Sequence, residues 1–321
     1  MKTLLNFSGI SFEVGQTKNG LTQSTGFARK YFHSLKDSNL EFIDRGDAQI
    51  PNLQGKIKIH SNDDLINVEW DKYRFAYEKT QRLLMNSYPL VNWGGDHSVA
   101  LATVGAFIEK FKNGFVVWID AHADLNLPAH SESGNLHGMP LGVLLNLKNI
   151  ADEYFPWLEQ HLDPKKLIYV GLRDIDPFEK EMIDGLGIKT YQFKEIQSLG
   201  MKVVAHEILA YTSGEALHVS FDIDAVDPKF APSTGVPVKE GLTPEDLSVL
   251  CEVLLKKSNV RSVDLVEINP ELGTAKQVDR TFTVAFNFLS SVFNSNFSGD
   301  THDCISERNF YEQSPQIEWN F

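Results

Sequence analysis

The segment from Trp118 to Pro140, WIDAHADLNLPAHSESGNLHGMP, decides how the rest of the chain is interpreted. It begins inside an apolar run, FVVWI at 115–119, which predicts a buried strand. Directly after this run, Asp120, His122 and Asp124 occupy alternate positions. Because residues two apart in an extended chain point to the same face, these three side chains are expected to converge.

Two other apolar runs end in side chains of the same kind. HVSFDIDAVDP at 218–228 carries Asp222 and Asp224, and VNWGGDHS at 91–98 carries His97. If the three runs are strands of one parallel sheet, their carboxyl ends meet at one edge, which is where open α/β sheets bind ligands. The sequence therefore predicts one site built from three strand ends.

The six side chains predict a site for two metal ions. Four carboxylates brought together without counter-charge repel one another, and two divalent cations would neutralise them. Six ligands are too many for one tetrahedral zinc, and oxygen-rich sites with some imidazole favour Mg²⁺, Mn²⁺ or similar ions. Taken singly, each element has an ordinary explanation as a turn, a helix cap or a structural histidine. Their joint occurrence favours a two-metal site with a bridging hydroxide, with these ligands: His97, Asp120, His122, Asp124, Asp222 and Asp224.

Composition excludes several classes of function. A net charge of −13 over 321 residues argues against nucleic-acid binding, and no apolar stretch of eighteen residues predicts a membrane span. The N-terminus lacks a clear small-residue cleavage site and is interpreted as a strand. The two cysteines, Cys251 and Cys304, form no C-x-x-C motif, so the expected compartment is the reducing cytoplasm.

Strands and helices alternate along the chain, which predicts an α/β fold with a mainly parallel sheet and helices on both faces. One domain is expected over 1–294, and 51–65 is expected to be loop. A single helix is expected at 68–86 and another at 194–212. The expected strands lie at 4–7, 40–44, 89–93, 115–119, 167–172, 188–192, 217–224 and 262–268.

Five motifs, in this order, carry a resemblance to a known family: GGDHS, DAHADLN, SGNLHGMP, SFDIDAVDP and EINPELG. They resemble the ureohydrolases (arginases, agmatinases and formimidoylglutamases), and the sequence is most similar to arginases. The resemblance implies an arginase-like three-layer fold, two Mn²⁺ ions with Co²⁺ or Ni²⁺ as substitutes, and a homotrimer or homohexamer. The implied reaction is hydrolysis of L-arginine to L-ornithine and urea.

The resemblance also implies catalytic roles. His137, in SGNLHG, would move a proton to the departing amine, because imidazole changes charge near working pH. Glu267 would hold the guanidinium by a bidentate contact, and Asp124 would serve both as ligand and in catalysis. The alternatives are that His137 only packs against Pro140 and that Glu267 forms an ion pair with an arginine such as Arg261 or Arg280.

Substrate contacts follow from the same resemblance. Asn126, Ser131 and Ser133 would hold an α-carboxylate, Asp176 an α-ammonium, and Glu179 would assist Asp176. Agmatine lacks the carboxylate and would leave the amide and hydroxyl donors unfilled, although Asn and Ser are also common turn residues.

Two positions depart from the arginase pattern: Val236 replaces a usual threonine, and Leu127 is less polar than usual. An agmatinase or a formimidoylglutamase is the main alternative, and a non-catalytic metal-binding subunit is the alternative from another class. The tail at 295–321 is either a frayed terminus or part of a subunit interface, and the oligomer implied by the resemblance favours the interface.

Overall fold

Eight strands form one sheet in which every neighbouring pair is parallel. The computed structural model describes residues 2–34, 39–48, 57–60, 65–68 and 70–293. The strand order is β2-β1-β5-β10-β9-β6-β7-β8. The bounds are β1 Thr3–Ile10, β2 Leu40–Asp47, β5 Leu90–Gly94, β6 Phe115–Ile119, β7 Leu167–Leu172, β8 Lys189–Gln192, β9 Ala216–Asp222 and β10 Asn259–Val266.

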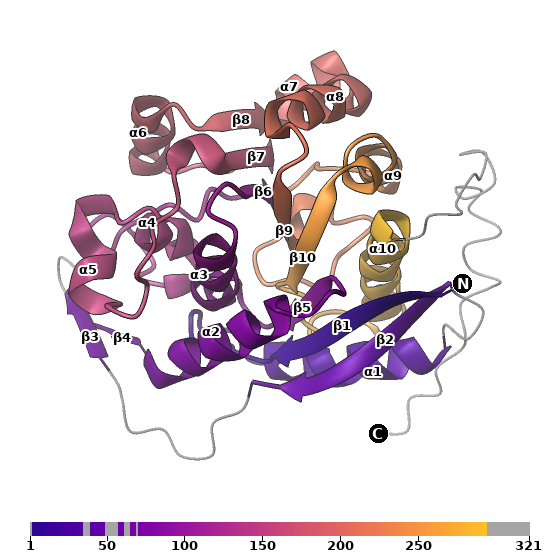
Figure 1. Ribbon diagram of the computed structural model, residues 1–321, viewed down its shortest axis with the longest axis horizontal. Helices are drawn as coiled ribbons and strands as arrows, with labels where there is room; N and C mark the ends of the chain where they lie inside the picture. The colour runs from indigo at the N-terminus through magenta and orange to yellow at the C-terminus, as the bar shows by residue number, and fades with distance from the viewer. Residues whose placement is uncertain (1, 35–38, 49–56, 61–64, 69, 294–321) are drawn as a thin grey trace.

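Helices cover both faces of this sheet (Figure 1). Helices α2 to α6 pack on one face, and α1 with α7 to α10 pack on the other. Their bounds are α1 Ser24–Ser34, α2 Trp70–Leu84, α3 Ala100–Lys110, α4 Pro140–Leu144, α5 Ile150–Tyr154, α6 Pro177–Leu186, α7 Phe193–Leu199, α8 Met201–Thr212, α9 Pro244–Val253 and α10 Ala275–Phe293. The inner strands are buried from both sides, as their apolar runs predict, whereas the edge strands β2 and β8 are partly exposed; the α/β fold class is confirmed.

The strand β6 shows how the two faces are filled. Val117 and Ile119 join the core cluster under α7 to α10, whereas Val116 and Trp118 join the cluster under α2 to α6. Side chains of a strand alternate between its faces, so one apolar strand contributes to both cores.

Two predictions about local structure are wrong. Part of the segment expected to be loop forms β3 Ile57–His60, which pairs antiparallel with β4 Leu65–Val68, and the following helix begins at Trp70. The sequence IKIH alternates apolar and polar residues, which is the period of a strand. The helix expected at 194–212 is two helices, α7 and α8, because Gly200 between them has a φ of 81°.

The central strands position the site. From β1 the chain moves outward to β2, and from β6 it moves outward in the other direction through β7 and β8. The strands β5, β10 and β9 lie between β1 and β6, so the direction of winding changes in this central part of the sheet, which includes β6. Ligands bind beyond the carboxyl ends of strands at such a point.

Within the described residues, no helix combines the length and the apolar character that crossing a membrane requires. The predictions for the tail at 295–321 lie outside the described residues.

We expect Gly95→Ala to destabilise the fold by about 3 kcal/mol or more, at the upper end of overpacking costs. A Cβ at this position would lie 1.5 Å from the carbonyl oxygen of Phe12. The matched control is Gly26→Ala in α1, where a Cβ meets nothing within 4 Å, and which we expect to be neutral or to stabilise by up to about 1 kcal/mol. Urea unfolding of both variants measures the difference. Equal stabilities would contradict the close approach at Gly95.

Candidate metal centre

The turn after β5 places His97 at the carboxyl end of the sheet. Asp96 organises this turn: its Oδ1 accepts from the Ser98 N–H at 3.0 Å, and its Oδ2 accepts from the Gly15 N–H at 2.8 Å. Asp96 was not among the predicted ligands, and an aspartate directly before a helical turn is a common capping residue.

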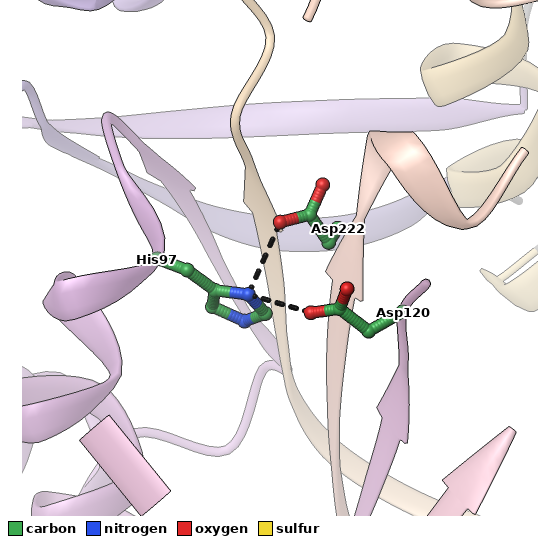
Figure 2. Close-up of side chains that lie close together, drawn as sticks. All are labelled: His97, Asp120 and Asp222. Atoms are coloured by element: carbon green, nitrogen blue, oxygen red, sulfur yellow. Dashed lines mark ion pairs between the residues drawn. The ribbon is translucent and has the colours of Figure 1, made fainter. Parts of the chain in front are cut away.

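Three carboxylates surround one nitrogen of His97, and Figure 2 shows two of them, Asp120 and Asp222. Its Nδ1 lies 3.0 Å from Asp120 Oδ2, 3.0 Å from Asp124 Oδ2 and 3.2 Å from Asp222 Oδ2. Within the described residues, this buried nitrogen has no hydrogen-bond partner of acceptable geometry. Ligands bound at about 2.1 Å and at right angles lie about 3.0 Å apart, so the spacing fits a cation held between these atoms.

A second group lies beside the first and shares Asp120 with it. His122 Nδ1 lies 3.1 Å from Asp224 Oδ2 and 3.6 Å from Asp120 Oδ1. Asp120 therefore turns one oxygen towards His97 and the other towards His122. The two triads, His97–Asp120–Asp222 and Asp120–His122–Asp224, each have ligand atoms within 4.8 Å of one another. The structure brings together all six of the predicted ligands, in an arrangement suited to two ions.

The charges of this cluster are unbalanced without cations. Burial, together with Asp224 and Asp120, raises the pKa of Asp222 well above its usual value. Burial and Asp120 likewise raise the pKa of Asp124 to about 6. Burial opposes a charge on His97, but Asp120, Asp124 and Asp222 outweigh it and raise the pKa of this imidazole. Crowded buried carboxylates that draw protons onto themselves and their neighbours are typical of a cation-binding site.

Two further residues hold the ligands in place. His97 Nε2 lies 2.8 Å from Ser220 Oγ, which orients the ring so that Nδ1 faces the carboxylates. Trp118 stacks on the His97 ring at 3.9 Å and donates from Nε1 to Asp120 Oδ2 at 3.0 Å. Neither residue was predicted. Each lies two residues before a ligand on the same strand, so the strand period was the signal that could have found them.

Backbone strain is present at the same edge. Asp124 has a φ of 50° and Glu267 a φ of 61°, values that residues other than glycine seldom adopt. Such strain persists where the surrounding structure imposes it, and it often accompanies functional sites.

A pocket of ≈ 230 Å³ opens over the cluster. His97 and Asp120 lie buried beneath it, and every other predicted site residue lines it. The pocket also includes Glu132, Gly138 and Asp174, which were not predicted as site residues. The lining residues are His122, Asp124, Asn126, Ser131, Glu132, Ser133, His137, Gly138, Asp174, Asp176, Glu179, Asp222, Asp224, Val236 and Glu267.

One wall of the pocket pairs His137 with Glu267. His137 Nδ1 lies 2.9 Å from Glu267 Oε1, and the same oxygen accepts from the His97 backbone N–H at 2.9 Å. Burial alone would lower the pKa of His137, but Glu267 more than offsets this and raises it to about 9. Arg261 and Arg280, the alternative partners for Glu267, donate to the carbonyl oxygens of Asn86 and Lys229.

Three further predicted residues of the pocket lining, Asn126, Asp176 and Glu179, are joined by hydrogen bonds near the start of α6. Asn126 Nδ2 donates to Asp176 Oδ2 at 2.7 Å. Glu179 accepts two backbone N–H groups, from Leu125 at 2.9 Å and from Asp176 at 2.9 Å. Burial raises the pKa of Glu179 to about 7, and these two donors oppose the shift. Glu179 therefore ties the start of α6 to the loop that follows β6.

Comparison with known proteins agrees with this geometry. A family model described as the Arginase family matches residues 9–294. Arginase-1 of Homo sapiens is 34% identical over 297 residues, which are 89% of this chain and 91% of that protein. An arginase of Coccidioides posadasii is 34% identical over 286 residues, 84% of this chain and 88% of that protein.

The fold of this chain also matches that of solved arginase structures. The crystal structure of arginase from Bacillus subtilis matches 92% of this chain and 100% of that one, with a TM-score of 0.77 and 30% identity. The chain therefore belongs to the arginase family, hydrolases that act on carbon–nitrogen bonds in linear amidines.

Proposed function

We propose that this protein hydrolyses L-arginine to L-ornithine and urea with two Mn²⁺ ions. The observation that carries the proposal is the shared carboxylate Asp120, which faces His97 with one oxygen and His122 with the other on the floor of the pocket. The assembly is proposed to be a homo-oligomer (a trimer or hexamer) in the cytoplasm.

The residues present fit two ions. His97, Asp120, Asp124 and Asp222 would hold one, and Asp120, His122 and Asp224 the other. Mixed imidazole and carboxylate ligands suit Mn²⁺, with Co²⁺ or Ni²⁺ as substitutes. When bound, such a pair supplies hydroxide near neutral pH and a Lewis acid for the substrate.

The guanidinium end of the substrate would meet Glu267. This carboxylate is 4% exposed and lies at the end of β10, and a guanidinium offers it a bidentate charged partner. Oε1 already accepts from the His97 N–H and lies 2.9 Å from His137 Nδ1, so the guanidinium would use Oε2 for one of its two contacts and share Oε1 with these groups for the other. Val236 would form an apolar part of the same wall.

His137 would carry the proton that the departing amine needs. Its contact with Glu267 favours the protonated imidazole, and the ring lies at the pocket wall. A protonated histidine at this place acts as a general acid when the carbon–nitrogen bond breaks. Glu267 then has two tasks: it orients His137 and it binds the substrate.

The α-amino acid end would meet the loop at 126–133. Ser131 Oγ accepts from the Gly134 N–H at 3.1 Å, and Ser133 Oγ accepts from the Asn135 N–H at 3.2 Å. The two hydroxyl oxygens lie 3.4 Å apart, so one hydroxyl can donate to the other while the second would donate its hydrogen to a carboxylate. Asp176 would accept the α-ammonium, and Glu179 would hold it in position through the Asp176 N–H.

We expect the protein loaded with Mn²⁺ to release urea from L-arginine at least about tenfold faster, in kcat/KM, than from agmatine. Agmatine leaves the serine and asparagine donors without a carboxylate. Asn126 is buried, whereas Ser131 is half-buried and Ser133 exposed, so we count the loss of one hydrogen bond to a charged group, about 1.5–3 kcal/mol. Urea and ammonia release from L-arginine, agmatine and N-formimino-L-glutamate, with Mn²⁺, Co²⁺ or Ni²⁺, measures this. Equal or better turnover of agmatine or the formimino compound would replace the proposed substrate, and hydrolysis of none would favour the non-catalytic alternative.

We expect His137→Asn to lower kcat by roughly 100-fold or more while both ions stay bound, because a general acid commonly contributes about 10²–10⁴-fold. Steady-state kinetics with metal analysis of the same sample tests this. Loss of metal in this variant would show that His137 acts on the ions and not on the leaving group.

We expect Asp120→Asn to abolish tight binding of both ions, because both groups use this carboxylate. Asp224→Asn is the matched variant: it should weaken only the ion beside His122 and leave one ion per chain. Mn²⁺ titration of chelator-treated protein by calorimetry gives the stoichiometries. The shared role of Asp120 would be refuted by one tightly bound ion in Asp120→Asn.

A further inference from the structure

Arg173 makes an unusual set of contacts beneath the pocket. It follows β7, and its backbone N–H donates to the Ala121 carbonyl at 2.9 Å. Its side chain is partly buried and does not line the pocket. We propose that Arg173 is a positioning residue that fixes the backbone of Asp224 and so builds the metal position beside His122. The inference rests on the metal centre of the proposed function.

Among the described residues, the hydrogen bonds of the guanidinium go to main-chain oxygens, and the group also lies over the Phe193 ring, 5.9 Å from its centre. Nη2 donates to the Asp224 carbonyl at 2.7 Å and to the Val238 carbonyl at 3.2 Å. Nη1 donates to the Ala225 carbonyl at 3.1 Å and, more weakly, to the Gly171 carbonyl at 3.4 Å. A planar group with five fixed donors can hold several carbonyl groups at once, which an ammonium on a flexible stem cannot do in the same geometry.

The carbonyls of Asp224, Ala225 and Val238 belong to two segments whose relative position determines the shape of the site. Asp224 and Ala225 form the short helix Ile223–Ala225 that presents the ligand Asp224. Val238 lies two residues after Val236, on the pocket wall. Arg173 therefore joins the ligand segment after β9 to the wall segment and to the end of β7.

The surrounding backbone leaves space for this guanidinium. Gly241 has a φ of 145°, and a Cβ there would lie 2.7 Å from Arg173 Nη2 and 2.9 Å from the Ala225 carbonyl oxygen. The Leu242 N–H also donates to the Ala225 carbonyl at 3.0 Å. A side chain at 241 would clash with the guanidinium. The hydrogen bonds of Arg173 therefore depend on glycine at this position.

Charge and geometry make different predictions. The positive charge lies near Asp224, Asp120 and Asp227, which it would partly neutralise. If charge were the whole role, lysine would replace arginine without loss. If the planar arrangement of N–H donors fixes the Asp224 backbone, Arg173→Lys keeps the charge but loses these hydrogen bonds, and metal binding beside His122 becomes weaker.

The test is a calorimetric Mn²⁺ titration of chelator-treated, full-length wild type, Arg173→Lys and Asp224→Asn. Asp224→Asn identifies the binding step that belongs to the ion beside His122. We expect Arg173→Lys to weaken that step by about 10- to 100-fold, the usual range for partners of metal ligands, and to change the other step by less than about threefold. The matched control is Arg29→Lys, which removes another partly buried guanidinium fork, held by Asp44 and Asp47.

The inference is overturned if Arg173→Lys binds both ions as the wild type does, if it weakens both steps alike, or if Arg29→Lys has the same effect. Should Arg173→Lys fail to fold, Arg173→Gln, which keeps one amide donor group, is titrated with the same expectation. Because the readout needs no substrate, it is independent of whether L-arginine is hydrolysed. Wild type that takes up fewer than two ions would instead overturn the metal centre itself.

Discussion

The structure depends on the compensation of four buried carboxylates at one edge of the sheet. Asp120, Asp124, Asp222 and Asp224 are each at most 7% exposed, and each lies close to an imidazole of the same cluster. Removing such charges from water costs several kcal/mol per ion unless opposite charge repays it. Two imidazoles, even if both are protonated, cannot balance four carboxylates. Cations bound at this centre, as proposed, would supply the missing positive charge, and folding would then be linked to metal binding.

A parallel sheet is well suited to build such a centre. Four adjacent strands, β5, β10, β9 and β6, end at the same edge, and each delivers at least one polar side chain there. Their apolar runs are buried in two cores, so the strand ends are held rigidly against the repulsion between the carboxylates. Asp124 and Glu267 have positive φ values, so the backbone adopts an unfavourable local conformation at two residues whose side chains reach the site.

Sequence reasoning found what is encoded locally. The alternation at 120–124 and at 222–224 predicted that these side chains converge, because side-chain direction in a strand depends only on position along it. The same period could have placed Ser220 on the face of Asp222, but its contact with His97 and the carbonyl contacts of Arg173 depend on how distant segments are aligned. Sequence reasoning missed the break at Gly200, where a single residue interrupts an otherwise helical pattern.

The pocket separates the chemistry from the choice of substrate. Its floor consists of the proposed metal ligands, which follow strand ends, together with Glu267 and His137, the residues to which we assign the reaction. Its rim consists of loop residues such as Ser131, Ser133 and Val236, which no strand constrains. A change in the floor disturbs charge compensation and the fold together, whereas a change in the rim alters only contacts with the substrate. Members of one family can therefore share the centre and differ in substrate, and in the proposed function the hydroxyl and amide donors of the rim would receive the carboxylate of the substrate.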